Sequence, residues 1–100
     1  MSDEKEITLL AELTFSAPVD ETVLGALNIL MKAVRQEPGC VEYAAHVHAN
    51  DARRIIFYER WASQKALDAH GAAPALAAWR ASVGHKLAGD PKLSFWKRLG

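Results

Sequence analysis

The stretch FYERWASQKALDAH, residues 57–70, changes from strand-forming to helix-forming chemistry within fourteen residues. The segment Arg54–Trp61 is rich in β-branched and aromatic side chains, as strands are. Ser63 then supplies the side-chain oxygen that a helix N-terminus needs, and a helical run follows as far as His70. The stretch therefore predicts a strand that passes directly into a helix, and the other elements can be placed relative to this junction.

A strand and a helix precede the junction. Residues Glu6–Ser16 alternate apolar and polar side chains, and a period of two predicts a strand with one buried face. Asp20 is then a natural helix N-cap, and Pro38 with Gly39 ends the helix. The helix carries an apolar stripe at the 3.6-residue period, which consists of Val23, Leu27, Leu30, Met31 and Val34.

The remaining segments complete the order β-α-β-β-α-β. Cys40–Ala49 alternates like a strand, and residues 50–53 have turn chemistry, which predicts an antiparallel hairpin with Arg54–Trp61. A second helical piece covers Ala75–Leu87, and a last strand covers Lys92–Leu99.

This order predicts a single α+β domain over residues 1–100, with its core at about residues 6–98. The expected architecture is a ferredoxin-like sandwich, in which helices cover one face of an antiparallel sheet. The other sheet face carries apolar as well as polar residues. We therefore expect that face to meet the sheet of a second copy in a homodimer.

Composition and charge argue against several classes of partner. Lys plus Arg equals Asp plus Glu, so the chain has no net charge and no basic footprint for nucleic acid. The acidic start MSDEKEITLL is unlike a signal peptide, and no apolar run approaches the ~20 residues of a membrane span. The single cysteine, Cys40, suits a reducing compartment, and we expect a cytoplasmic protein.

Two short patterns have both a chemical and a structural interpretation. His46 and His48 share one strand face and could reach one metal ion, with Glu42 or Glu59 as a third ligand. The pattern is short, solvated or interface histidines are favoured, and we assign no metal. Cys40 follows a helix end and could be a nucleophile, but no base is near it in sequence, which favours a small core residue.

An aromatic and basic cluster predicts a ligand pocket near the junction. Trp61 shares its strand face with Phe57, whereas Tyr58 points to the opposite face. The following helices add His70, Trp79 and Arg80, which suit the lining of a small aromatic ligand. The alternative is that both tryptophans fill the core and His70 caps a helix. The residues alone leave both interpretations open.

Three motifs in order resemble the antibiotic biosynthesis monooxygenase (ABM) family: EPGCVEY at 37–43, FYERW at 57–61 and ALDAH at 66–70. The likeness covers about residues 6–98. It implies a dimeric α+β barrel, in which two ferredoxin-like sheets pack together. Several members of the family oxidise quinols or polycyclic phenols with O2 and need neither metal nor organic cofactor, whereas others degrade heme or process small signalling molecules.

The resemblance also implies roles for residues. His70 matches the histidine of the family motif and would be the base, because an imidazole titrates near neutrality. Trp61 would be a pocket wall, Arg80 could hold a developing oxyanion, and Tyr58 could line the pocket or stay in the sheet. The implied function is a cofactor-independent monooxygenase that oxidises a small quinol or phenol with O2.

Several positions depart from the family pattern. Polyketide-oxidising relatives have a polar residue four before the matching tryptophan and an aromatic residue six after it, where this chain has Phe57 and Leu67. A Pro-His pair is replaced by Pro74 and Ala75. The first strand lacks the Asn of heme-degrading relatives, although His85 could be an axial ligand. These departures favour the alternative of a non-catalytic dimeric domain that binds a small ligand.

Overall fold

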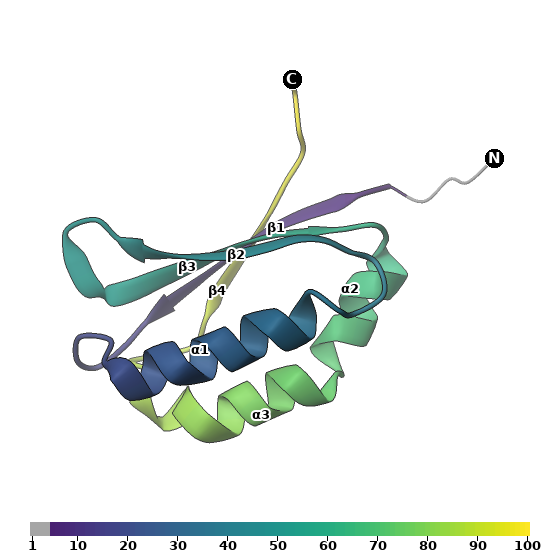
Figure 1. Cartoon of the computed structure of the whole chain (residues 1–100). Helices are drawn as coiled ribbons and strands as arrows, with labels where there is room; N and C mark the ends of the chain where they lie inside the picture. Colours follow the sequence, from purple (N-terminus) through teal and green to yellow (C-terminus); the bar gives the residue numbers. More distant parts are fainter. Residues whose placement is uncertain (1–4) are drawn as a thin grey trace.

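The computed structural model describes residues 5–100. Its elements are β1 (Ile7–Thr14), α1 (Glu21–Val34), β2 (Cys40–His48), β3 (Asp51–Trp61), α2 (Gln64–Gly71), α3 (Pro74–Val83), the 3-10 turn η1 (Gly84–Lys86) and β4 (Lys92–Trp96). The four strands form one antiparallel sheet in the order β2-β3-β1-β4, and the helices lie on one side of it (Figure 1). This arrangement confirms the predicted ferredoxin-like α+β fold.

The strand register separates a helix face of the sheet from an open face. On the helix face, Leu9 pairs with Glu59 and Ala11 pairs with Phe57. On the open face, Leu10 pairs with Tyr58. Because successive side chains of a strand point to opposite faces, the register places each residue of the FYERW motif on one face of the sheet. Phe57, Glu59 and Trp61 point to the helices.

The core lies between the helix face and the helices. In α1, the predicted stripe is buried at Val23, Leu27, Leu30 and Val34. The Asp20 carboxylate accepts a hydrogen bond of 3.0 Å from the backbone N–H of Val23, which confirms the predicted N-cap. Helices α1 and α3 run side by side beneath the sheet, as Figure 1 shows.

Gly39 brings the end of the α1–β2 loop against α2. Its φ of +81° is in the left-handed region that favours glycine. A Cβ at this position would lie only 2.4 Å from the Cβ of Ala66 in α2. The backbone N–H of Ala62 also donates to the Gly39 carbonyl, at 2.8 Å. This close approach holds Glu37, two positions earlier in the same loop, next to α2.

Three element boundaries differ from the prediction by three or more residues. Helix α3 ends at Val83 instead of Leu87, and the chain tightens into the 3-10 turn at Gly84, a weak helix former. The hairpin turn is shorter than expected, because β3 already begins at Asp51. Strand β4 ends at Trp96. Within residues 5–100, every helix is too short or too polar for a membrane crossing.

Candidate active site

A cavity of about 190 Å³ lies between the helix face of the sheet and the segment from α2 to η1. Small residues open this space, since Ala11 is central in β1 and Gly71 and Gly84 also border the cavity. Most of the other lining side chains are apolar, including Leu9, Phe57, Leu76, Trp79, Leu87 and Leu93. The polar and ionisable lining side chains are Tyr43, Glu59, His70 and Arg80.

His70 reaches the cavity from the last turn of α2. The Ser63 hydroxyl fixes the start of that helix by accepting a hydrogen bond of 3.1 Å from the Ala66 N–H, as the sequence predicted. The imidazole is 5% exposed and stacks on the Trp61 indole, with ring centroids 4.6 Å apart. The Tyr43 ring meets it edge-on at 5.7 Å. The imidazole is therefore clamped on two sides.

The two imidazole nitrogens face different carboxyl groups. Nδ1 lies 2.9 Å from Oε1 of Glu37, and Nε2 lies 3.9 Å from Oε1 of Glu59. An ionised carboxylate only accepts hydrogen bonds, so Nδ1 donates to Glu37 and the lone pair of a neutral ring is on Nε2. Glu59 lines the cavity, and Nε2 is the nitrogen on its side.

Glu59 is a buried carboxyl group, with 4% of its surface exposed. The indole N–H of Trp61 donates to its Oε1 at 2.9 Å. Burial raises the pKa of Glu59, and the charge of Glu37 acts in the same direction, against the lowering effects of Trp61 and His70. Burial likewise raises the pKa of the Tyr43 phenol far above its usual range, so that this phenol stays neutral.

The structure gathers four of the six predicted site residues at the cavity: Phe57, His70, Trp79 and Arg80. Trp61 is fully buried one layer deeper, where it supports the His70 ring. Tyr58 lies on the open face of the sheet, beside Thr8 and Arg60. Strand alternation separates Tyr58 from the cavity, so it stays in the sheet, the second of the two places that the resemblance allowed.

The pair of carboxyl groups around His70 was not predicted from the sequence. Glu37 is 33 positions from His70, and its motif indicated only the end of a helix. The sequence suggests Glu59 only as a possible metal ligand, although strand alternation places it on the same face as Trp61. Tyr43 was also missed as a lining residue. The sequence feature that could have indicated both carboxyl groups as site residues is their position within the EPG and FYERW motifs.

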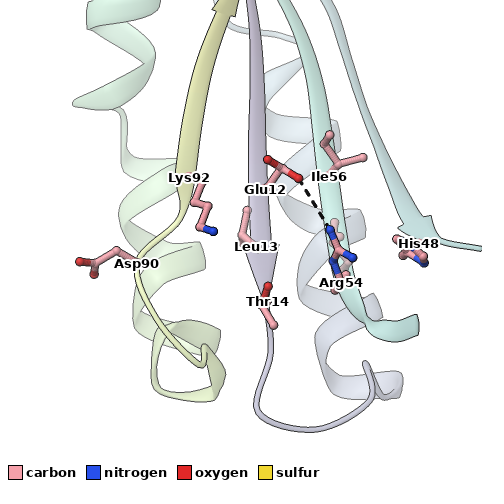
Figure 2. A pocket seen from close by; sticks show the side chains of 9 residues that line it. Glu12, Leu13, Thr14, His48, Arg54, Ile56, Asp90 and Lys92 are labelled. Carbon is pink, nitrogen blue, oxygen red and sulfur yellow. Dashed lines mark ion pairs between the residues drawn. The ribbon is translucent and has the colours of Figure 1, made fainter. Parts of the chain in front are cut away.

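A second hollow, of about 190 Å³, lies at the far end of the sheet (Figure 2). Its side chains include Lys92 and the exposed ion pair between Arg54 and Glu12, which are 3.9 Å apart. His48 borders this hollow, and its Nδ1 accepts a hydrogen bond of 3.0 Å from the Asn50 N–H in the hairpin turn. In residues 5–100, no three His, Cys, Asp or Glu side chains gather as a metal site would require.

Comparison with known proteins identifies the family. The model of the antibiotic biosynthesis monooxygenase family matches residues 6–82, and the chain therefore belongs to that family. Searching the curated proteins gave no match.

Solved structures share the fold at low sequence identity. Rv0793 from Mycobacterium tuberculosis is 23% identical, with a TM-score of 0.81 over 96% of this chain and 97% of its own. A candidate antibiotic biosynthesis monooxygenase from Caulobacter crescentus is 23% identical, with a TM-score of 0.87 over 97% and 92%. Another, from Nitrosomonas europaea, is 20% identical, with a TM-score of 0.84 over 99% and 95%.

Proposed function

We propose that this protein is a cofactor-independent monooxygenase that oxidises a small phenol or quinol with O2. The observation that carries the proposal is the setting of His70: Glu37 holds Nδ1, and Nε2 is on the side of an apolar cavity. This is the geometry of a general base, because the orienting carboxylate fixes the tautomer and stabilises the imidazolium that forms.

The proposed reaction begins with proton transfer. A phenolic hydroxyl in the cavity donates to Nε2 of His70, and the imidazole takes its proton. The phenolate that remains is electron-rich and passes electrons to O2. The apolar walls of the cavity exclude water and so favour the reaction of the phenolate with O2 over side reactions with solvent. The protein supplies orientation, a base and a dry site, and the substrate supplies the electrons.

Phe57, Trp79 and Arg80 would place the aromatic ring. The Phe57 and Trp79 rings meet edge-to-face, with centroids 6.1 Å apart, and both border the cavity. Arg80 also lines this cavity and is exposed to solvent. Its guanidinium would attract the oxyanion that develops on the substrate.

The atoms balance without an external reductant. A hydroquinone and one O2 give a hydroxyquinone and one water. One oxygen atom enters the ring and the other leaves as water, and the organic substrate supplies all four electrons.

We also propose that the protein is a cytoplasmic homodimer in which the open faces of two sheets meet. Leu10, Ile56 and Tyr58 lie on this face without helical cover, and Trp96 of β4 is 57% exposed beside them. The charges among them are paired, since Arg60 contacts both Glu6 and Glu42. Paired charges and exposed aromatic surface suit association with a second copy.

Oxygen uptake tests the enzymatic proposal. We expect protein-dependent uptake with at least one member of a panel of hydroquinones, naphthoquinols and anthrones. His70→Ala should lower the rate about 10²–10⁴-fold, the usual contribution of a general base. The exposed variant Ile29→Ala is the control.

The absence of uptake across the panel would contradict the proposal. If the ligands nevertheless raise the unfolding free energy, by ~2.7 kcal/mol at a concentration of 100 times Kd, the protein is a ligand-binding domain without turnover.

A further inference from the structure

Glu59 is a buried ionisable group at the cavity that has no role in the proposed proton transfer. It lies next to the free nitrogen of the base, with its Oε1 3.9 Å from Nε2 of His70. The carboxyl is anchored at 2.9 Å by the Trp61 indole, which also supports the His70 ring. Trp61 thus holds the base and the carboxyl group in a fixed relation.

Burial favours the neutral form of Glu59, and the charge of Glu37 acts in the same direction. The ionisable groups that face it are Glu37 from the α1–β2 loop, Cys40 and Tyr43 from β2 and His70 from α2. Arg80 of α3 borders the same cavity but is exposed to solvent. A charge on Glu59 would be a buried anion close to the Glu37 carboxyl group, which is unfavourable in a low dielectric. Burial raises the pKa of Glu59 accordingly.

We propose that Glu59 acts as a neutral carboxylic acid that donates a hydrogen bond to the phenolic oxygen of the substrate while Nε2 of His70 removes the proton from that oxygen. A protonated carboxyl uses one oxygen to accept the Trp61 N–H and the other to donate. Oε1 is the oxygen that accepts the Trp61 N–H and lies 3.9 Å from Nε2, so the proton to be donated is on Oε2 of the same carboxyl group. A phenolic oxygen at ~2.8 Å from Nε2 lies next to this carboxyl group.

The step balances without a change of oxidation state. The phenolic O–H bond breaks, the Nε2–H bond forms, and the electron pair stays on the phenolate oxygen. Glu59 keeps its own proton and stabilises the new anion. This role rests on the proposed function and sharpens its ligand class: the site selects a molecule with an acidic hydroxyl on an apolar ring, because an apolar ligand would leave the Glu59 donor unpaired.

The first test needs no ligand. Carbon-13 NMR of the glutamate carboxyl groups at neutral pH should show one protonated carboxyl in the wild type. That signal should be missing from Glu59→Gln and present in Glu21→Gln, which changes an exposed glutamate. If every glutamate that the spectrum resolves is ionised at neutral pH, including Glu59, the proposal is overturned.

The second test uses 4-nitrophenol, whose anion absorbs visible light. At a pH where the free probe is ionised, Glu59→Leu should weaken binding of the anion roughly tenfold or more, which is the effect of losing a hydrogen bond to a charged group. Glu59→Gln should bind it nearly as tightly as the wild type, because the amide keeps a donor. Tighter binding by Glu59→Gln, or equal binding by Glu59→Leu, would overturn the role.

The outcomes separate this role from the monooxygenase proposal. If both tests succeed and no oxygen is consumed, Glu59 anchors a phenolate in a protein that is not an oxygenase. If the probe does not bind the wild type, the role of Glu59 and the phenolic ligand class fall together. Circular dichroism checks that Glu59→Leu is folded, and the isosteric Glu59→Gln keeps the test decisive if it is not.

Discussion

At the residue scale, His70 depends on two side chains from distant parts of the sequence. Glu37 comes from the loop after α1, and Glu59 comes from β3. Each carboxyl group faces a different ring nitrogen, so one orients the ring of the proposed base and the other lies beside the nitrogen that is proposed to react. A single substitution on either side should therefore change the site in a different way.

Replacing Glu59 tests its protonation through stability. Because burial raises its folded-state pKa, the native state binds the proton more tightly than the unfolded state does. The stability from this proton is complete below the unfolded-state value of about 4.3 and is lost as pH rises through the folded-state pKa. The wild type should thus lose stability relative to Glu59→Gln with rising pH, by at most about 1.4 kcal/mol per pH unit.

Urea unfolding of both proteins at several pH values between about 5 and 8 measures this difference. Glu21→Gln serves as the control, because Glu21 is exposed and should give a constant difference from the wild type. A difference for Glu59→Gln that does not change with pH would contradict the prediction.

The position of a residue was predictable from the sequence where it depends on one local rule. It was not predictable where it depends on contact between two distant segments. Alternation correctly separated Tyr58 from Trp61, because strand geometry is local. It could not show that Trp61 lies behind His70, since that layer depends on how α2 packs against β3. The contact between Glu37 and His70 was equally out of reach, because it depends on the close approach of the α1–β2 loop to α2.

At the element scale, α1 binds the sheet through one stripe. Leu30 is 2% exposed, whereas its neighbour Ile29 is 72% exposed. Leu30→Ala should lower the free energy of unfolding by about 2–5 kcal/mol, because it leaves a cavity in the core. Ile29→Ala should change it by less than ~0.5 kcal/mol. Thermal or urea unfolding compares the two, and similar losses for both would contradict the observed orientation of the helix.

The junction between the α1–β2 loop and α2 rests on Gly39. Gly39→Ala should destabilise the protein by about 1–2 kcal/mol from the left-handed backbone alone, with a further loss from the contact with Ala66. Ala66→Gly alone should cost ~1 kcal/mol of helix propensity.

The double variant distinguishes backbone strain at Gly39 from steric overlap between the new Cβ and Ala66. Combining Gly39→Ala with Ala66→Gly removes the methyl group that the new Cβ would meet, so the double variant should lose less stability than the two single losses added together. A double-mutant cycle from urea unfolding measures the difference. Strict additivity would show that the two positions do not touch.

Helix and strand centres were predictable, but their ends were less so. The α1 stripe and the Asp20 and Ser63 caps follow local rules, and all are present. The segment after α3 is less predictable, because Leu87 forms an isolated bridge with Phe15, which is distant in sequence. The bulge between Cys40 and Glu42 in β2 likewise has no marker in a single sequence.

At the scale of the whole molecule, the sheet has one face covered by helices and one without them (Figure 1). If the open faces of two copies meet, light scattering should give twice the 11.0 kDa mass of one chain. Trp96→Glu should shift the equilibrium toward monomer, because it places a charge in the interface. Ile29→Glu, on the outer surface of α1, should not. A wild-type monomer at all concentrations would contradict the homodimer.

The three tryptophans occupy three different surroundings, and their fluorescence can therefore report on three parts of the molecule. Trp61 is buried against His70, Trp79 borders the cavity, and Trp96 is exposed beside the open face. We expect a protonated imidazole to quench the indole that stacks on it, so emission from Trp61 should follow the charge of the proposed base. Variants that keep one tryptophan each would let a spectrometer follow proton transfer, ligand entry and association separately, without an added label.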